Sequence, residues 1–196
     1  MTKILLTAFE PYDRWPENSS WLAVIELTRR LESRSQIVTR RYPVDLRAAS
    51  DRLRKDLLDN YDFAIHLGQS PGSSVLRLET TGLNLHSDGT PLIEDAPAAY
   101  MTPIAVNRLR DSLLIQRIPV EVSHHAGTYL CNAMLYLSQH VSAQLGLPTR
   151  SIFLHLPLAP EQVAAAATTM ASASTSLMAT AIGHVIQELE TSSIVV

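Results

Sequence analysis

The sequence predicts an α/β fold in a single domain, 1–196, built around a mostly parallel, twisted central sheet. Its 196 residues suffice for one α/β domain with a substantial core. Strand-like and helix-like segments alternate along much of the chain. No internal repeat or low-complexity linker divides it. Alternation of this kind is typical of a parallel sheet covered by helices.

The first half of the chain shows the alternation most clearly. Strands are predicted over 3–9, 36–44 and 61–68, which are apolar runs bounded by turn residues. A helix is expected between the first two strands, with Ser19 or Ser20 as its N-cap. A second helix is expected after Asp45, with Leu46, Ala49, Leu53 and Leu57 on its inner face.

The second half continues less regularly. The segment 75–85 is predicted as a strand, with an antiparallel partner as one arrangement, and 86–103 as a loop. Thr102 and Pro103 then suit the N-cap and first position of a helix. Strands are expected over 118–123 and 150–158, separated by a helix that begins near Gly127–Thr128. A final helix is expected to end near Glu190.

Composition excludes several function classes. The net charge is only −3, and no basic cluster stands out beyond Arg40–Arg41, so we expect no nucleic-acid partner. A single cysteine cannot form an intrachain disulfide, and the N-terminus lacks a signal-peptide pattern. The segment 162–187 has no charged residue, but it is rich in Ala, Ser and Thr and amphipathic in its second half. We therefore expect a soluble, cytoplasmic protein with no membrane partner.

Cys131 is the only cysteine and lies near the start of a predicted helix, in SHHAGTYLCN. A thiol attacks carbonyl carbon as the thiolate, which a helix N-terminus and a nearby imidazolium both favour. His155 and Glu79, from separate predicted strands, are candidates for a base and its orienting group. From the residues alone the alternatives stay open. Cys131 and His155 are equally compatible with a packed core, and Glu79 with a solvated face.

A metal site is a weaker interpretation. His124 and His125 are adjacent, and neighbours on an extended strand point to opposite faces. No His-x₃-His or Cys-x₂-Cys spacing supports zinc. A metal-assisted amidohydrolase using His124, His125 and His155 is nevertheless kept as an alternative.

Five blocks, in order, resemble the pyroglutamyl peptidase I family, the pyrrolidone-carboxylate peptidases. LLTAFEPYDRWPENSSWLAV resembles the family's T-G-F-x-P-F-G-G segment and the N-P-S-W that follows it. HLGQSPGSSVLRLETTGLN resembles its G-Q-x-G-G-R block with the catalytic glutamate. SHHAGTYLCN is similar to its nucleophile block, S-x-x-A-G-T-Y-x-C-N, and FLHLPLAPEQ to its histidine block, F-x-H-x-P-x-x-P-E-Q. STSLMATAIGHVI resembles its closing helix.

The resemblance implies a three-layer α/β/α fold and a Cys-His-Glu triad. Cys131 would be the nucleophile, His155 the general base and acid, and Glu79 the group that orients His155. The substrate would be a peptide with an N-terminal pyroglutamate, and no metal or organic cofactor is needed. The pocket for the lactam ring would be formed by Phe9 and Tyr12, by backbone around Gln69, and by Val44, Tyr129 and Leu130. Family members are often homodimers or homotetramers.

The chain departs from the family pattern around the substrate. Ala8 replaces the first-block glycine, Tyr12 a phenylalanine and Asp13–Arg14 a glycine pair, while Ser73 or Ser74 stands near the missing G-Q-x-G-G-R arginine. In the loop 86–97, Gly89 falls where the family has an arginine linked to the pocket. We expect Asp13, Arg14 and Glu17 to be solvated. The sequence thus favours a cysteine peptidase, with two alternatives: a weakly active member that binds small ligands or peptide termini, and a thiol amidohydrolase of altered specificity.

Overall fold

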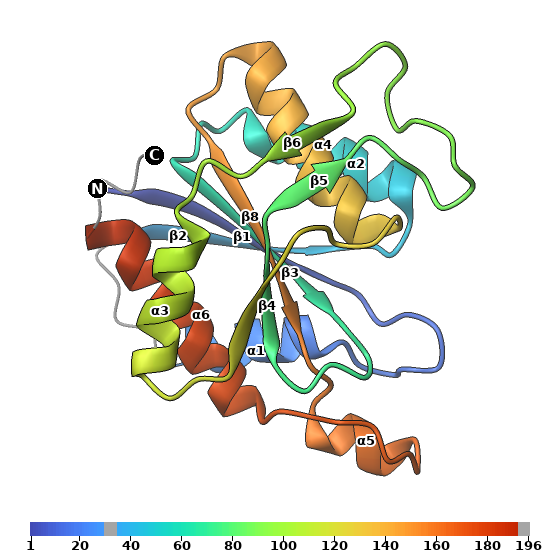
Figure 1. Ribbon diagram of the computed structural model, residues 1–196, viewed down its shortest axis with the longest axis vertical. Helices are drawn as coiled ribbons and strands as arrows, with labels where there is room; N and C mark the ends of the chain where they lie inside the picture. The colour runs from blue at the N-terminus through green and yellow to red at the C-terminus, as the bar shows by residue number, and fades with distance from the viewer. Residues whose placement is uncertain (30–34, 192–196) are drawn as a thin grey trace.

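Six strands form the central sheet of the computed structural model, which describes residues 1–29 and 35–191 (Figure 1). Every neighbouring pair is parallel except β4 and β8, which are antiparallel. The prediction of a mostly parallel sheet is therefore confirmed. The spatial order is β2 (Gln36–Tyr42), β1 (Lys3–Phe9), β3 (Phe63–Gln69), β8 (Arg150–Leu156), β4 (Leu76–Glu79) and β7 (Val120–Ser123).

Helices cover both faces of this sheet, so the predicted three-layer arrangement is confirmed. One face carries α1 (Ser19–Thr28), α3 (Val106–Ile115) and α6 (Thr175–Thr191), and the other carries α2 (Leu46–Leu57) and α4 (Leu130–Leu145) (Figure 1). Each face has its own apolar core. The short α5 (Pro160–Ala165) follows β8 directly. A two-stranded antiparallel sheet, β5 (Thr81–Leu83) with β6 (Ala99–Met101), packs beside α4.

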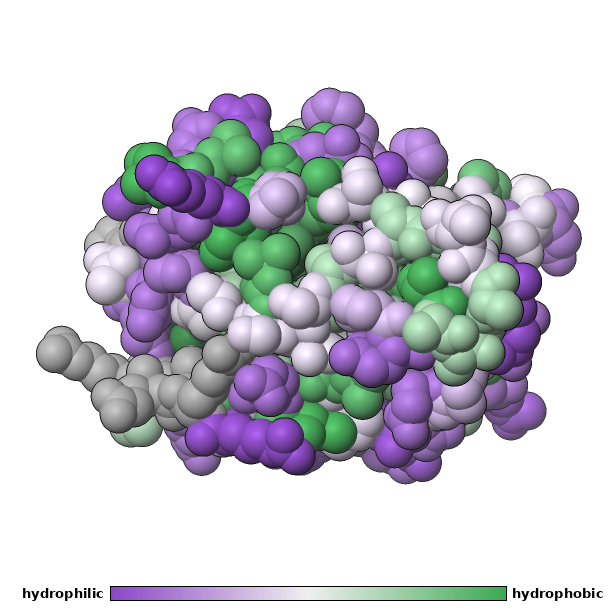
Figure 2. Space-filling model, turned by 90° about the horizontal axis from the view of Figure 1, so that it is seen from below, coloured by the Kyte–Doolittle hydropathy of each residue, from purple (hydrophilic) through white to green (hydrophobic). Residues whose placement is uncertain are grey.

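Local sequence signals correctly predicted several of these elements. Asp45 caps α2, because its side chain accepts a hydrogen bond from the Ala48 N–H at 2.8 Å. The apolar stripe predicted for the last helix is the buried side of α6, with Leu177 at its margin. Within the described residues, no helix is both long and apolar enough to cross a bilayer. On the face shown in Figure 2, apolar patches lie among polar residues.

Four expectations about element boundaries are wrong. Asn18, not Ser19 or Ser20, caps α1, and its Oδ1 accepts from both the N–H and the hydroxyl of Ser20. Helix α3 begins at Val106 rather than at Pro103, and the Thr102 hydroxyl accepts from the Ile104 N–H at 3.2 Å while it donates to the Ser151 carbonyl at 2.7 Å. Helix α4 begins at Leu130, after an extended Tyr129. Part of the expected loop 86–103 forms β6, which pairs with β5.

Strand β5 lies unusually close to α4 at Gly82. A Cβ built at Gly82 would stand 2.5 Å from the backbone nitrogen and 2.7 Å from the Cα of Tyr136. The buried side chain of Asn132 ties the same two elements together. Its Oδ1 accepts from the Leu83 N–H at 2.7 Å, and its Nδ2 donates to the carbonyls of Leu83 and Leu85. This contact fixes the start of α4 against the segment that follows β4.

We expect Gly82→Ala to lower the free energy of unfolding by about 1–3 kcal/mol, because the added methyl meets helix backbone that cannot move aside. Gly183→Ala is the matched control. Gly183 lies in the interior of α6, and the nearest atom to a Cβ built there would be Leu27 Cδ1 at 3.6 Å. That change should raise the free energy of unfolding by about 0.5–1 kcal/mol, since alanine favours helix. Urea denaturation of both variants measures the difference, and equal stability of Gly82→Ala and the parent protein would contradict the close packing.

Candidate active site

Cys131 lies in the first turn of α4, above the end of strand β3. The side of β3 under it is kept clear by Gly68, whose Cβ would stand 2.9 Å from the Cys131 sulfur and 2.6 Å from the Phe153 ring. A side chain at position 68 would therefore displace the thiol or the ring. Cys131 is only partly buried, so its sulfur remains reachable.

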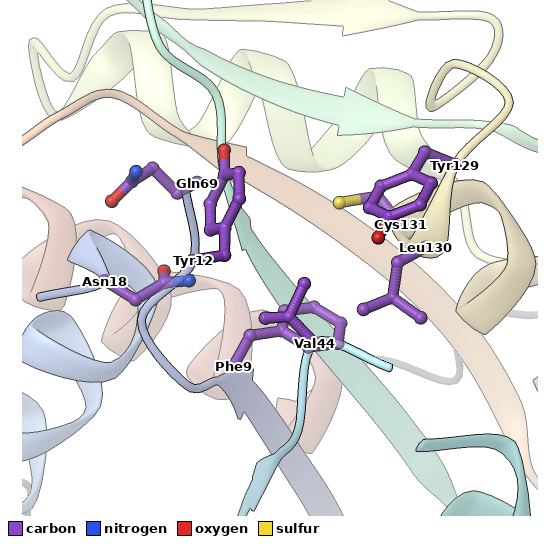
Figure 3. Close-up of a pocket in the computed structure, with 8 residues that line it drawn as sticks. All are labelled: Phe9, Tyr12, Asn18, Val44, Gln69, Tyr129, Leu130 and Cys131. Atoms are coloured by element: carbon purple, nitrogen blue, oxygen red, sulfur yellow. The ribbon is translucent and has the colours of Figure 1, made fainter. Parts of the chain in front are cut away.

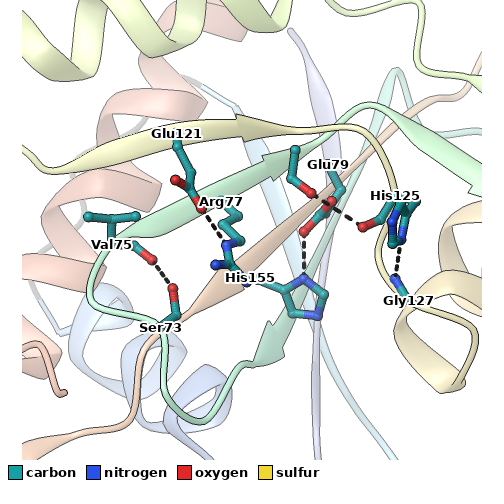
Figure 4. A network of polar contacts seen from close by, with 9 residues as sticks. Ser73, Val75, Arg77, Glu79, Glu121, His125, Gly127 and His155 are labelled. Carbon is teal, nitrogen blue, oxygen red and sulfur yellow. Dashed lines mark hydrogen bonds and ion pairs between the residues drawn. The ribbon is translucent and has the colours of Figure 1, made fainter. Parts of the chain in front are cut away.

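The histidine of the predicted triad is fixed by a buried carboxylate. Strands β8 and β4 pair antiparallel, with Phe153 opposite Glu79, and this register brings His155 Nδ1 within 2.7 Å of Glu79 Oε1 (Figure 4). Glu79 is 1% exposed. A salt bridge so far from water is a strong constraint on the orientation of the imidazole ring.

The charge state of His155 reflects both its burial and its neighbours. Burial lowers the pKa of His155, but the charge and hydrogen bonding of Cys131, together with Glu79, outweigh it and raise this pKa to about 9. The imidazole is therefore protonated at neutral pH. A protonated ring donates from both nitrogens, so it can serve Glu79 on one side and the sulfur on the other.

The backbone at the start of α4 leaves hydrogen-bond donors open. Gly127 has φ of +79°, and Tyr129 at the N-cap is extended and makes no side-chain capping bond. The first-turn N–H groups of a helix have no partner within the helix. Around Cys131 these amides form a region of partial positive charge that suits an anion or a developing oxyanion.

A pocket of about 60 Å³ opens beside Cys131 (Figure 3). Its walls come from the end of β1, the loop before α1, the segment between β2 and α2, the end of β3 and the start of α4. All six residues predicted for substrate binding take part. The lining is Phe9, Tyr12, Asn18, Val44, Gln69, Tyr129, Leu130 and Cys131.

The tyrosine that replaces the family's phenylalanine stands between the sulfur and an amide. Burial raises the pKa of Tyr12, and the charge of Cys131 acts in the same direction, while the side chain of Gln69 opposes the rise. Tyr12 therefore stays neutral over the physiological range. Its hydroxyl faces polar neighbours rather than a wholly apolar wall.

Gln69 is held in place by three segments of the chain. Its Oε1 accepts from the Ser19 N–H at 2.8 Å and from Gln162 Nε2 at 2.7 Å. Gln162 also donates to the Glu17 carbonyl and accepts from the Ala159 N–H. These bonds connect the end of β3 with the starts of α1 and α5.

The backbone of Gln69 faces an unpaired edge. Ser70 donates to Leu156 of β8, so by alternation the N–H and C=O of Gln69 point toward β1. The ladder between β1 and β3 ends at Thr7 and His66. The Gln69 peptide groups are therefore free of ladder bonds at the pocket.

Other residues singled out in the sequence lie apart from this pocket. Asp13, Arg14 and Glu17 are exposed, as predicted. Gly89 is exposed on the loop 86–97, with no atom within 4 Å of its Cβ position. His124 and His125 are also exposed, and in the described part of the chain no three His, Cys, Asp or Glu side chains gather as a metal site would require.

Sequence reasoning missed four residues that shape the site: Asn18, Gly68, Asn132 and Gln162. Asn18 was detectable, since asparagine is a strong N-cap immediately before a predicted helix. Gln162 stands in the PEQ segment of the histidine block, and Asn132 follows Cys131 directly. The sequence places Gly68 beside Gln69 at the end of a predicted strand, where ligand sites gather, but only the folded chain shows what lies above it.

Comparison with known proteins identifies the family of this chain. The pyroglutamyl peptidase family model matches residues 2–190. A pyrrolidone-carboxylate peptidase of Pseudomonas fluorescens is 36% identical over 84% of this chain and 82% of its own. One of Pyrococcus furiosus is 32% identical over 82% and 83%. The crystal structure of pyrrolidone carboxyl peptidase from Fervidobacterium islandicum superposes with a TM-score of 0.90 at 32% identity, covering 97% of this chain and 99% of that one. The chain belongs to the pyroglutamyl peptidase family.

Proposed function

We propose that this protein is a cysteine peptidase that hydrolyses the amide bond after an N-terminal pyroglutamyl residue. Family membership supports the substrate class. The single observation that carries the mechanism is the buried bond between His155 and Glu79 next to Cys131, at the edge of a small pocket. We assign Cys131 as nucleophile, His155 as acid and base, and Glu79 as the group that orients His155.

The pocket accounts for recognition of a five-membered lactam ring. Phe9 and Tyr12 supply aromatic surface from the first strand and loop, and Val44, Tyr129 and Leu130 close the remaining walls. The open N–H and C=O of Gln69 would pair with the carbonyl and N–H of the lactam. A ring held in this way places its exocyclic carbonyl next to the Cys131 sulfur.

Acylation uses the Cys131 sulfur and the proton held by His155. The Cys131 thiolate attacks the exocyclic carbonyl carbon, forming a C–S bond and a tetrahedral oxyanion. Amides at the start of α4 stabilise this oxyanion. The imidazolium of His155 gives its proton to the leaving amine as the C–N bond breaks, which leaves a thioester and a neutral imidazole.

Deacylation reverses the role of His155. Its neutral imidazole takes a proton from water, and the oxygen attacks the thioester carbonyl. The C–S bond then breaks, releasing pyroglutamate and restoring the thiolate and imidazolium pair. Glu79 keeps Nδ1 protonated throughout, so that the same ring nitrogen always faces the sulfur.

We also propose a cytoplasmic location and a homodimer or homotetramer. A reducing compartment would keep the lone thiol of Cys131 reduced. The oligomer rests on resemblance to the family. Sedimentation velocity measures it directly.

Hydrolysis of a neutral pyroglutamyl-fluorophore amide, with and without prior iodoacetamide, tests the function. Turnover that iodoacetamide abolishes supports both the substrate class and the thiol. Rapid alkylation of Cys131 without turnover would direct attention to another amide substrate. Absence of both would favour a binding protein that retains the fold.

Cys131→Ser is expected to abolish this hydrolysis while leaving the melting temperature close to that of the parent protein. A serine hydroxyl stays protonated at neutral pH and is a poor nucleophile here. Turnover and thermal unfolding are measured on the same preparation. Substantial activity in this variant would exclude Cys131 as the nucleophile.

The activity should decline as pH rises through about 9, since His155 then loses the proton that the leaving amine requires. Glu79→Gln removes the negative charge that helps to raise this pKa and leaves a neutral amide oxygen as the acceptor, so it should move the decline to lower pH and reduce kcat/KM. The measurement is kcat/KM against pH for both proteins. An identical alkaline limb in Glu79→Gln would show that Glu79 does not set the charge of His155.

Gly68→Ala is expected to reduce kcat by at least about tenfold, because the methyl would press on the sulfur and misplace it. Gly183→Ala, remote from the site, should retain full activity. Rates of alkylation by iodoacetamide report on the thiol independently of substrate. Parent-like turnover in Gly68→Ala would mean that the sulfur has room to move.

A further inference from the structure

Arg77 lies beside the catalytic histidine, on the side away from the ring pocket. In the antiparallel pairing of β4 with β8, Arg77 is directly opposite His155. Directly opposed residues project to the same face of a sheet with their Cβ atoms about 4.5–5.5 Å apart. In Figure 4 the side chain of Arg77 reaches from β4 toward Glu121, while that of His155 reaches toward Glu79. The mechanism described above does not use Arg77.

The order of the strands in the sheet indicates the direction in which a bound peptide would run. The ring pocket lies over β1 and β3, Cys131 lies over Gly68 of β3, and His155 follows on β8. The next strands outward are β4, with Arg77, and β7, with Glu121. With its ring in the pocket and its carbonyl at the sulfur, a peptide therefore extends its leaving group past His155 toward Arg77.

Arg77 presents a positive charge along this path. Its Nε donates to Glu121 Oε1, and the side chains of the two residues are 40% and 50% exposed. Glu121 lies one strand farther out, so a leaving group arriving from His155 meets Arg77 first. In the described part of the chain, no other recorded bond engages the two terminal nitrogens of Arg77.

We propose that Arg77 is a specificity-determining residue that binds a carboxylate on the leaving group. This rests on the proposed function. The carboxylate belongs either to the C-terminus of a pyroglutamyl dipeptide or to an acidic side chain directly after pyroglutamate. One residue advances an extended chain by about 3.5 Å, and neighbouring strands lie about 4.8 Å apart. The residue after pyroglutamate therefore covers most of the distance from β8 to β4, and the long side chain of Arg77 can reach either its terminal or its side-chain carboxylate. A guanidinium suits carboxylates because its planar N–H groups match their two oxygens.

Two matched pairs of peptides test the proposal. Pyroglutamyl-alanine against pyroglutamyl-alanine amide isolates the terminal carboxylate. Pyroglutamyl-glutamate amide against pyroglutamyl-glutamine amide isolates the side-chain carboxylate. For each pair, the ratio of the kcat/KM of the charged peptide to that of the neutral one is measured at low and high salt.

In the parent protein the charged peptide of at least one pair should be preferred, and high salt should weaken the preference by screening. Arg77→Ala should reduce that ratio by about two- to fivefold, the range for a partly exposed ion pair, with little effect on the neutral peptides. Arg77→Lys should restore part of the lost preference for the charged peptide. Glu121→Gln removes the carboxylate that competes for Arg77 and should raise the ratio above that of the parent protein. Arg110→Ala, which breaks the exposed Arg110–Asp111 pair on α3, is the control and should change neither ratio.

The proposal is overturned if Arg77→Ala leaves both ratios unchanged or lowers kcat/KM for all four peptides alike. A fall in the ratios with Glu121→Gln, matching that of Arg77→Ala, would also overturn it, because a purely structural ion pair responds in this way. Hydrolysis of the neutral fluorophore amide separates these results from failure of the proposed function. If that amide and all four peptides resist hydrolysis, both proposals fall.

Discussion

The antiparallel pairing of β4 with β8 is the constraint on which the site depends. Among the described residues it is the one antiparallel pairing in the six-stranded sheet, and its register places Glu79 and Arg77 on the same face as His155. A shift of one residue would turn both side chains to the opposite face. The buried carboxylate and the guanidinium, two residues apart on β4, therefore both face the side of the sheet that carries the imidazole.

Two buried histidines show how neighbours decide charge. His66 and His155 lie on adjacent strands and both are at least nine-tenths buried. Burial alone lowers the pKa of His66 to about 3, so this ring is neutral and bonds to the Thr7 hydroxyl. At His155 the charge and hydrogen bonding of Cys131, together with Glu79, reverse the effect and raise the pKa to about 9. The charged ring suits proton transfer, while the neutral ring serves packing.

Much of the fold could be predicted because it follows local rules. Asp45 caps α2 by a bond to a residue three positions on, and α6 buries a stripe readable from helical spacing. Predictions failed where a distant partner intervened. Thr102 looked like a helix cap but donates to Ser151 of β8, and 99–101 looked like loop but pairs with β5. Such contacts join residues far apart in sequence, which local propensity does not encode.

The sequence by itself determined the alternation of strands and helices, the lone thiol near a helix start and, through its motif blocks, the family. It also identified six of the seven residues that line the pocket together with Cys131, all but Asn18. Only the tertiary structure decided that Gly68 clears the space under the sulfur, that Gln162 holds Gln69, and that Arg77 flanks the imidazole. The physical reason is that these relations depend on strand order and register, which are set by the packing of the whole sheet rather than by any single segment.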